Sequence, residues 1–303
     1  MEQKIRIGTR DSQLALWQAT LVQEQLEALG HPSELVHIKS EGDIDLVTPL
    51  YAIGVQGVFT RTLDAALLSG RIDLAVHSMK DVPVQLAQGL WAAAVLRRAS
   101  PADLLVLRGD ASFLDDRDGV ATIATSSLRR KAQWLHRYPR HHVDNLRGNV
   151  NTRLAKVAAS DWQGAIFAAA GLERIGLRPD NAVVLDWMLP APAQGAILVA
   201  CRMDDDALRS VCAPLNDTVT AACVDTERAF LSALMGGCST PIGALAEPAA
   251  GGIRFRGNVC ALDGSRCLNV DRTAAVNDAP ALARAAAGEL LAAGAGRLIQ
   301  KMA

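Results

Sequence analysis

Basic and hydroxyl side chains gather in one segment of this 303-residue chain. Between positions 126 and 156 there are eight Lys or Arg residues and one acidic residue, although the chain as a whole has a net charge of −1. Arg129 and Arg130 fall in the first turn of an expected helix, directly after Thr125 and Ser127, where the helix dipole disfavours cations. Guanidinium groups, hydroxyls and backbone N–H groups at a strand-to-helix turn bind anions. This placement favours an anion site over an ordinary solvated basic face.

Two other strand-to-helix turns carry the same residue types. Arg147 and Arg153 flank the next turn along the chain, and Arg10 precedes Ser12 at the first turn of the sequence. Open α/β folds bind ligands at the carboxyl ends of their parallel strands. We therefore expect Arg147 and Arg153 to share a sheet edge with Arg129, and Arg10 to form an equivalent anion site in another sheet domain.

The segment His77–Pro83 offers a candidate catalytic carboxylate. Asp81 follows an expected strand and lies beside Lys80. A carboxylate among cations stays ionised and can stabilise positive charge on a substrate. The alternative is that Asp81 only caps a turn before Pro83. His77 is interpreted as a packed strand residue rather than as a base.

Cys238 is the candidate nucleophile, because Gly236 and Gly237 place it on a thin loop, although a lone cysteine is usually structural. The other cysteines show no CxxC or Cys/His spacing, so no metal site is expected. Cys201 and Cys212 lie in apolar stretches and are interpreted as core thiols. A reducing, cytoplasmic setting follows.

Two alternating strand and helix patterns must position these residues. The first has expected strands at 5–8, 35–38 and 72–77 and helices at 12–29 and 60–68, with a buried stripe at Ala15, Ala19, Val22, Leu26 and Leu29. The second has strands at 104–107, 120–124, 143–146, 164–168 and 183–185, with helices at 128–137 and 151–159. Such alternation predicts βαβ units and a mostly parallel sheet in each domain.

The last ninety residues differ, and predict a small α+β domain. A helix is expected at 217–235, strands at 253–260 and 267–275, and a final helix from 278 to 301. The segment 196–201 resembles a strand that can return to the first sheet. The expected domains are residues 1–96 with 196–213, residues 97–195, and residues 214–303.

Composition excludes several classes of protein. Half of the residues are hydrophobic, which argues against disorder, and the small net charge argues against a general nucleic-acid binder. No apolar run approaches the roughly 18 residues of a membrane span. The N-terminal residues lack a secretory apolar segment.

Several long motifs, in order along nearly the whole chain, resemble porphobilinogen deaminases (hydroxymethylbilane synthases). The similar stretches are residues 6–18 (RIGTRDSQLALWQ), 73–83 (DLAVHSMKDVP), 125–130 (TSSLRR), 146–154 (LRGNVNTRL), 170–177 (AGLERIGL), 193–196 (AQGA), 227–230 (ERAF) and 236–238 (GGC).

The resemblance implies two α/β domains built like periplasmic binding proteins, doubly wound, and a C-terminal α+β domain that carries the cysteine loop. It implies a dipyrromethane cofactor joined to Cys238 through a thioether. It also implies a monomer that deaminates four porphobilinogen molecules, couples them head to tail on this primer, and releases hydroxymethylbilane for haem biosynthesis. By similarity Asp81 is catalytic, and the residues that contact substrate or cofactor are Arg10, Ser12, Lys80, Thr125, Ser127, Arg129, Arg130, Arg147, Arg153, Arg174 and Gln194.

The chain departs from the family pattern at three places. Gln56 stands where the family generally has Lys, Glu41 stands where a base is common, and Pro192-Ala193 replaces the usual Gly before Gln194. The alternatives to an enzyme are a non-catalytic anion-binding protein on the same scaffold and a nucleic-acid binder. The absence of a secretory segment and the presence of Asp81 and Cys238 argue against the first. The second lacks a binding motif.

Overall fold

The computed structural model describes residues 4–39, 60–237 and 240–300. Contacts divide the chain into two units. Of the described residues, the first unit holds 4–39, 60–99 and 195–221, and the second holds 100–194, 222–237 and 240–300. No helix within these ranges is long and apolar enough to cross a membrane.

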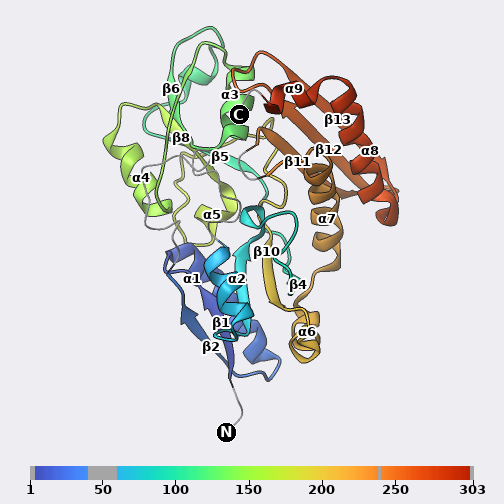
Figure 1. Ribbon diagram of the computed structural model, residues 1–303. Helices are drawn as coiled ribbons and strands as arrows, with labels where there is room; N and C mark the ends of the chain where they lie inside the picture. The colour runs from blue at the N-terminus through green and yellow to red at the C-terminus, as the bar shows by residue number, and fades with distance from the viewer. Residues whose placement is uncertain (1–3, 40–59, 238–239, 301–303) are drawn as a thin grey trace. The chain divides into compact units, whose positions relative to one another are not determined.

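The sheet of the first unit has one strand that runs against the others. Its order is β2-β1-β3-β10-β4 (Figure 1). The pairs β1–β2 and β1–β3 are parallel, whereas β10 is antiparallel to β3 and β4. The prediction that 196–201 returns to this sheet is thus confirmed. The strands are β1 (Ile5–Thr9), β2 (Ser33–His37), β3 (Leu74–Ser78), β4 (Leu90–Val95) and β10 (Ile197–Arg202).

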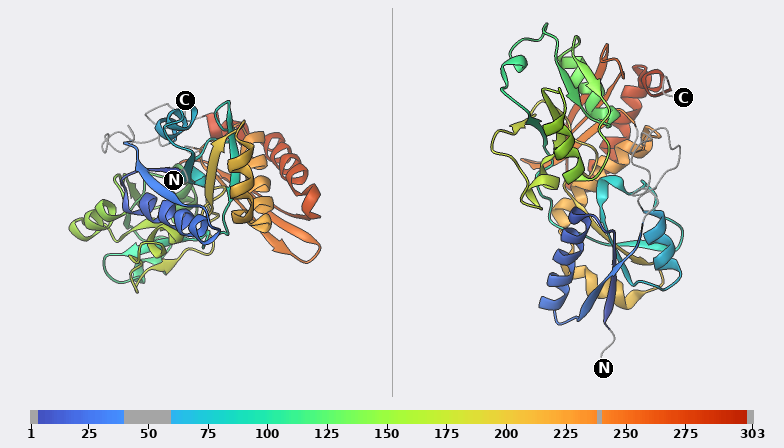
Figure 2. Two further views of the ribbon diagram at one scale, coloured as in Figure 1. Left: turned by 90° about the horizontal axis from the view of Figure 1, so that it is seen from below. Right: turned by 90° about the vertical axis from the view of Figure 1, so that its left-hand side faces the viewer.

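Helices cover both faces of this sheet, as the right-hand view of Figure 2 shows. Leu74 and Val76 pack with α1 (Gln13–Ala28) on one face. Ala75, between them, packs on the other face with α2 (Arg61–Leu68). Alternate side chains of a strand point to opposite faces, so a strand covered on both sides is apolar throughout.

The predicted buried stripe of α1 is confirmed in its middle. Ala19, Val22 and Leu26 are fully buried in the core that the helix α6 (Asp206–Cys212) also joins. Leu29, in contrast, is 45% exposed, because the helix ends at Ala28 and Leu29 is its C-cap.

The sheet of the second unit repeats this plan. Its order is β7-β6-β8-β5-β9, with β6 parallel to β7 and β8, and β5 antiparallel to β8 and β9. The mostly parallel sheets predicted from sequence are therefore confirmed. The strands are β5 (Asp103–Leu107), β6 (Thr122–Ala124), β7 (His142–Asp144), β8 (Gly164–Ala168) and β9 (Val183–Val184).

Three helices flank the second sheet. Trp134 and Tyr138, on and just after α3 (Leu128–Arg137), pack on one face against Ile166 of β8. Phe167, the next residue of that strand, packs on the other face with α4 (Val150–Ala159) and α5 (Ala169–Glu173). Both five-stranded sheets are thus doubly wound, as predicted.

The C-terminal part forms a three-stranded antiparallel sheet with helices. The sequence predicted two of its strands and missed β11, whose Gly, Ala and Pro residues favour strands poorly. It is an edge strand, where Pro248 is tolerated. The final helix is interrupted at Gly294, which has a φ of 100°. The elements are α7 (Thr218–Ala233), β11 (Ile242–Ala249), β12 (Gly252–Cys260), β13 (Cys267–Ala274), α8 (Ala279–Ala292) and α9 (Ala295–Gln300).

This sheet belongs to the same unit as the second five-stranded sheet, so the division into three domains stays a prediction. Four short 3-10 turns complete the described elements: η3 (Met79–Asp81), η4 (Ser112–Leu114), η5 (Ala213–Leu215) and η6 (Val276–Asp278).

A disulfide joins Cys260 to Cys267, a pair that sequence spacing did not reveal. The two residues end β12 and begin β13, and they oppose each other in the antiparallel register. Cys201 and Cys212 are buried free thiols, as predicted. Burial raises the pKa of Cys201 to about 11 and that of Cys212 to about 12, so neither is a nucleophile at neutral pH.

Candidate active site

In the first unit, the loop after β1 places Arg10 and Ser12 at the start of α1. Ser12 is the N-cap, and its hydroxyl accepts a hydrogen bond of 3.3 Å from the backbone N–H of Ala15. Arg10 is half-buried. Burial, and then the charge of Arg10, lowers the pKa of His77 to about 4. This coupling shows that Arg10 lies near the end of β3, and it agrees with the interpretation of His77 as a packed residue.

Lys80 and Asp81 lie in η3, directly after β3. The turn is fixed from both sides, because Met79 is buried and its N–H donates to the carbonyl of Ala196. The Nε2 of Gln18, on α1, donates to the hydroxyl of Ser78 at 2.8 Å. The structure therefore brings Arg10, Ser12, Lys80 and Asp81 to the same edge of the first sheet, where β1 and β3 end.

The carboxylate of Asp81 is half-buried. Within the parts of the chain that the structure describes, no hydrogen bond or ion pair involves this side chain. The turn is closed instead by the backbone, through the N–H of Val82 and the carbonyl of Met79 at 3.2 Å. A carboxylate that capped the turn would accept a local N–H, so the geometry gives the turn-capping alternative no support.

In the second unit, hydroxyl groups build the loop between β6 and α3. The Oγ of Ser127 caps α3 by accepting from the N–H of Arg130, and the buried Thr125 accepts from the N–H of Ser127 at 3.2 Å. Ser126 donates to Asn145 Oδ1 at 2.7 Å and accepts from the N–H of Leu146 at 3.1 Å. These bonds join the loop after β6 to the loop after β7.

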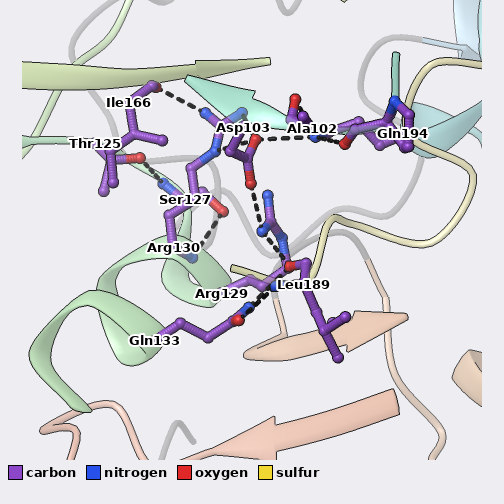
Figure 3. A network of polar contacts seen from close by, with 12 residues as sticks. Ala102, Asp103, Thr125, Ser127, Arg129, Arg130, Gln133, Ile166, Leu189 and Gln194 are labelled. Atoms are coloured by element: carbon purple, nitrogen blue, oxygen red, sulfur yellow. Dashed lines mark hydrogen bonds and ion pairs between the residues drawn. The ribbon is translucent and has the colours of Figure 1, made fainter. Parts of the chain in front are cut away.

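Arg129 and Arg130 surround a carboxylate that sequence reasoning missed. Asp103 is fully buried, and its two oxygens lie 2.7 Å from Arg129 Nη1 and 2.7 Å from Arg130 Nη2 (Figure 3). Gln194 adds a hydrogen bond of 2.9 Å from Nε2. Burial raises the pKa of Asp103, but the charges of Arg129 and Arg130 outweigh burial and hold the pKa well below its usual range.

This ion cluster orients the two arginines. Arg130 also donates to the carbonyl of Ile166 at 2.9 Å, and Arg129 donates to that of Leu189 at 2.7 Å. The Nε of Arg129 is buried, and no residue in the described ranges accepts a hydrogen bond from it. One feature of the sequence could have revealed Asp103. It is an acidic residue at the start of the apolar run 103–107, and a buried charge requires a partner of opposite sign.

The remaining predicted arginines follow β7 and β8. Arg147 is 4% exposed, in the loop that Asn149 ends by capping α4. Arg153 is half-buried on that helix, and Arg174 is half-buried at the C-cap of α5. Burial lowers the pKa of Arg174 to about 10, against the opposing charge of Glu173, and the side chain remains cationic at neutral pH.

The sequence also did not reveal the role of Glu227, a buried glutamate that accepts backbone hydrogen bonds next to Gln194. Its Oε2 accepts the N–H of Ala193 at 2.6 Å, and its Oε1 accepts that of Ala246 at 2.8 Å. Ala193 has a φ of 63°. The residue before Gln194 therefore has the left-handed backbone that favours glycine, which gives a physical reason for the Gly usual in similar sequences.

Cys238 lies outside the described residues, as do Gln56 and Glu41. The described residues that flank positions 238 and 239 are Gly237 and Thr240. The N–H of Thr240 donates a hydrogen bond of 3.1 Å to the carbonyl of Gly237. The predicted roles of Cys238 and of all the site residues above stay predictions.

The chain was compared with solved structures. It is similar to a nutrient-binding protein from Burkholderia cenocepacia bound to methionine, at 17% identity over 69% of this chain and 89% of that one, with a TM-score of 0.42. It is also similar to the probable amino-acid ABC transporter extracellular-binding protein ytmK from Bacillus subtilis, at 12% identity over 70% and 90%, with a TM-score of 0.43. An ancestral cationic amino acid solute-binding protein matches at 15% identity over 70% and 87%, with a TM-score of 0.44.

Comparison with family models gave two matches. The model for the porphobilinogen deaminase dipyrromethane cofactor-binding domain matches residues 5–210, and that for the porphobilinogen deaminase C-terminal domain matches residues 221–292. The first alone covers more than half of the chain and includes Arg10, Asp81, Arg129 and Gln194. The chain therefore belongs to the porphobilinogen deaminase family.

Proposed function

We propose that this chain carries its dipyrromethane cofactor on Cys238, uses Asp81 as the catalytic carboxylate, and releases hydroxymethylbilane after joining four porphobilinogen molecules. The family gives the activity itself: the chain is a transferase of tetrapyrrole biosynthesis that polymerises porphobilinogen on a dipyrromethane cofactor. The observation that carries the assignment to residues is the carboxylate of Asp81, which lies on an anchored turn beside Lys80.

Asp81 acts on positive charge. Loss of ammonia from porphobilinogen leaves an electron-poor methylene-pyrrole, whose ring N–H is a hydrogen-bond donor. A carboxylate without a competing partner among the described residues can accept this N–H and stabilise the cation as the next pyrrole attacks. The positive charges of Lys80 and Arg10 suit the acetate and propionate groups of the same substrate.

The second unit supplies cations that fit a cofactor with several carboxylates. The Nε of Arg129 is buried, and no described residue accepts a hydrogen bond from it. Arg147 is almost fully buried in the loop after β7. These residues, with Arg130, Arg153 and Arg174, would hold the carboxylates through bidentate contacts. When bound, the cofactor supplies the primer to which the first substrate is joined. Thr125, Ser127 and Gln194 fix the loops that carry these arginines.

The chain is proposed to work as a cytoplasmic monomer that does not bind nucleic acid. The net charge of −1 supports the absence of a nucleic-acid partner. Among the described cysteines, the free buried thiols of Cys201, Cys212 and Cys223 fit a reducing setting, whereas the Cys260–Cys267 disulfide does not. Light scattering after gel filtration tests the monomer: a mass near 32.1 kDa is expected, and a mass twice as large contradicts it.

The covalent proposal is tested by intact mass. We expect purified protein to exceed its sequence mass by two pyrrole units, and to convert porphobilinogen to hydroxymethylbilane. Cys238→Ser removes the added mass and most of the activity, whereas the matched control Cys223→Ser keeps both. A fully active protein without added mass, or a Cys238→Ser variant that retains the increment, contradicts attachment at Cys238.

A further inference from the structure

Two guanidinium groups share one carboxylate in the ion cluster of the second unit. Asp103 Oδ1 accepts hydrogen bonds from Arg130 Nε at 3.1 Å and from Arg130 Nη2 at 2.7 Å, as well as from Gln194. Arg129 reaches the other oxygen, Oδ2, through Nη1 only. Burial lowers the pKa of Arg129, the charge of Asp103 opposes this, and the charge of Arg130 lowers the pKa further. Arg129 therefore has the fewer bonds to the shared carboxylate, and a further contact must fix its orientation.

That further contact is the carbonyl of Leu189, which lies 2.7 Å from Arg129 Nη1. Nη1 carries two N–H groups, so Asp103 and Leu189 together use both. No residue in the described ranges accepts a hydrogen bond from Nε or Nη2 of Arg129. The position of the Leu189 carbonyl therefore decides in which direction this unused edge of the guanidinium points.

Leu189 lies on a segment without regular secondary structure and is held by Gln133, a side chain of α3. Gln133 Nε2 donates to the carbonyl of Leu189 at 2.9 Å, and Gln133 Oε1 accepts the N–H of Leu189 at 2.8 Å (Figure 3). Because the backbone of Leu189 offers one donor and one acceptor, the amide fits in a single orientation. Gln133 follows Arg129 by four positions, so the two side chains lie on the same face of the helix.

Strand β11 closes the other side of this segment. The N–H of Ala244 donates to the carbonyl of Pro190 at 3.0 Å. A Cβ at Gly243 would lie 2.9 Å from Leu189 Cβ and 3.1 Å from Gln133 Nε2, so the strand is in close contact with both residues. The Leu189 backbone is thus clamped between α3 and β11, and its carbonyl holds Arg129 in place.

A buried glutamine needs hydrogen bonds wherever it lies, and pairing with the backbone would by itself give Gln133 only a structural role. The observation that points further is that its acceptor is shared. The Leu189 carbonyl accepts from Gln133 Nε2 and from Arg129 Nη1, which uses both of its lone pairs. Loss of Gln133 therefore releases Leu189 and, with it, one of the two acceptors that orient Arg129.

We infer that Gln133 is a positioning residue of the cofactor site, which acts through the Leu189 carbonyl on the guanidinium of Arg129. The inference rests on the proposed function, in which Arg129 holds carboxylates of the dipyrromethane cofactor. The Nε and Nη2 edge of a guanidinium matches a carboxylate in a bidentate contact. Gln133 keeps this edge of Arg129 in one direction before the cofactor is bound, which lowers the cost of ordering the site.

The test is the fraction of full-length protein that carries the cofactor, measured by intact mass in variants purified under identical conditions. Gln133→Met keeps an unbranched, helix-forming side chain but removes both bonds to Leu189. We expect it to lower the loaded fraction by about twofold or more. Gln163→Met is the matched control, because Gln163 Oε1 also accepts a backbone N–H, that of Thr122 at the start of β6. It is expected to keep the native loaded fraction.

A double-mutant cycle with Arg129→Lys separates positioning from general stability. Arg129→Lys lowers the loaded fraction, since lysine keeps the charge but not the planar fork. If Gln133 acts through Arg129, Gln133→Met causes no further loss in this background. The same fold-loss in both backgrounds would show a purely structural role and overturn the inference. Leu290→Ala, which removes a buried side chain of α8, is expected to lower the melting temperature without lowering the loaded fraction.

Gln133→Glu is the second variant, in case Gln133→Met does not fold. It keeps an acceptor for the N–H of Leu189 but cannot donate to the carbonyl, and we expect it to fold and to be loaded less than the native protein. Full loading of either Gln133 variant overturns the inference and leaves the role of Arg129 intact. Full loading of Arg129→Lys contradicts instead the proposed role of Arg129, and the inference fails with it.

Discussion

Gln194 donates a hydrogen bond of 2.9 Å from Nε2 to Oδ1 of Asp103, an oxygen that Arg130 also contacts. The same Nε2 lies 2.7 Å from the carbonyl of Pro101. Gln194 thus fixes the start of β5, and Asp103 in turn fixes the guanidinium groups of Arg129 and Arg130. The segment 193–196 is one of the stretches that resemble porphobilinogen deaminases. Through Gln194 it has a structural role in orienting these arginines.

Asp103→Asn is expected to destabilise the protein strongly. The substitution leaves two buried guanidinium groups without their shared counter-ion, and breaking a buried ion pair costs about 3–5 kcal/mol. Urea denaturation measures the loss. The matched control is Asp110→Asn, an exposed acid of the same unit, for which less than about 0.5 kcal/mol is expected. Equal stability of the two variants would show that Asp103 does not hold the cluster together.

Asp81→Asn is expected to lower kcat by about a hundredfold or more, with little change in KM, because the lost charge acts mainly in the transition state. Asp81→Glu is expected to retain part of the activity, since its charge survives with shifted geometry. Steady-state kinetics and a thermal melt on cofactor-loaded protein decide the point. A lower melting temperature with normal kcat would instead assign Asp81 to the turn.

Stability is expected to fall as pH decreases from about 6.5 to 4, partly because of His77. Burial and Arg10 lower the pKa of this residue to about 4 in the folded state. In the unfolded chain His77 is protonated near pH 6.5, whereas in the folded chain it is protonated only near pH 4. Between these values the unfolded state binds more protons, so lowering the pH favours unfolding. The contribution is at most about 3 kcal/mol.

His77→Gln removes this dependence, which urea titrations at several pH values can measure. His31→Gln, at a turn outside the core, serves as the control and keeps the native pH profile. If the His77→Gln variant loses stability with the same slope as the native protein between pH 6.5 and 4, another group is responsible.

Ala193→Gly is expected to stabilise the protein by about 1 kcal/mol. Ala193 has a φ of 63°, a left-handed conformation that disfavours a residue with a Cβ by about 1–2 kcal/mol, and glycine loses part of this gain through chain entropy. Ala158→Gly, on the exposed side of α4, is the control and is expected to destabilise by about 1 kcal/mol. Thermal melts of both variants test whether the melting temperature rises for Ala193→Gly and falls for Ala158→Gly. A lower melting temperature for Ala193→Gly would contradict the strain argument.

The sequence by itself predicted the two doubly wound sheets, since apolar periodicity reports which face of each element is buried. Ala19, Val22 and Leu26 on α1 illustrate this. It also identified the family, because long motifs such as residues 73–83 keep their residues and order. It did not predict β11, whose Gly-, Ala- and Pro-containing sequence has little strand preference and is held by pairing with β12.

Only the tertiary structure decided which polar groups share a partner. Asp103 and Gln194 are ninety-one positions apart, and Glu227 reaches the backbone of both Ala193 and Ala246. Periodicity and local motifs describe neighbours along a strand or a helix, whereas a buried charge is satisfied by whatever the packed elements bring to it. For the same reason the disulfide between Cys260 and Cys267 follows from strand register rather than from residue spacing.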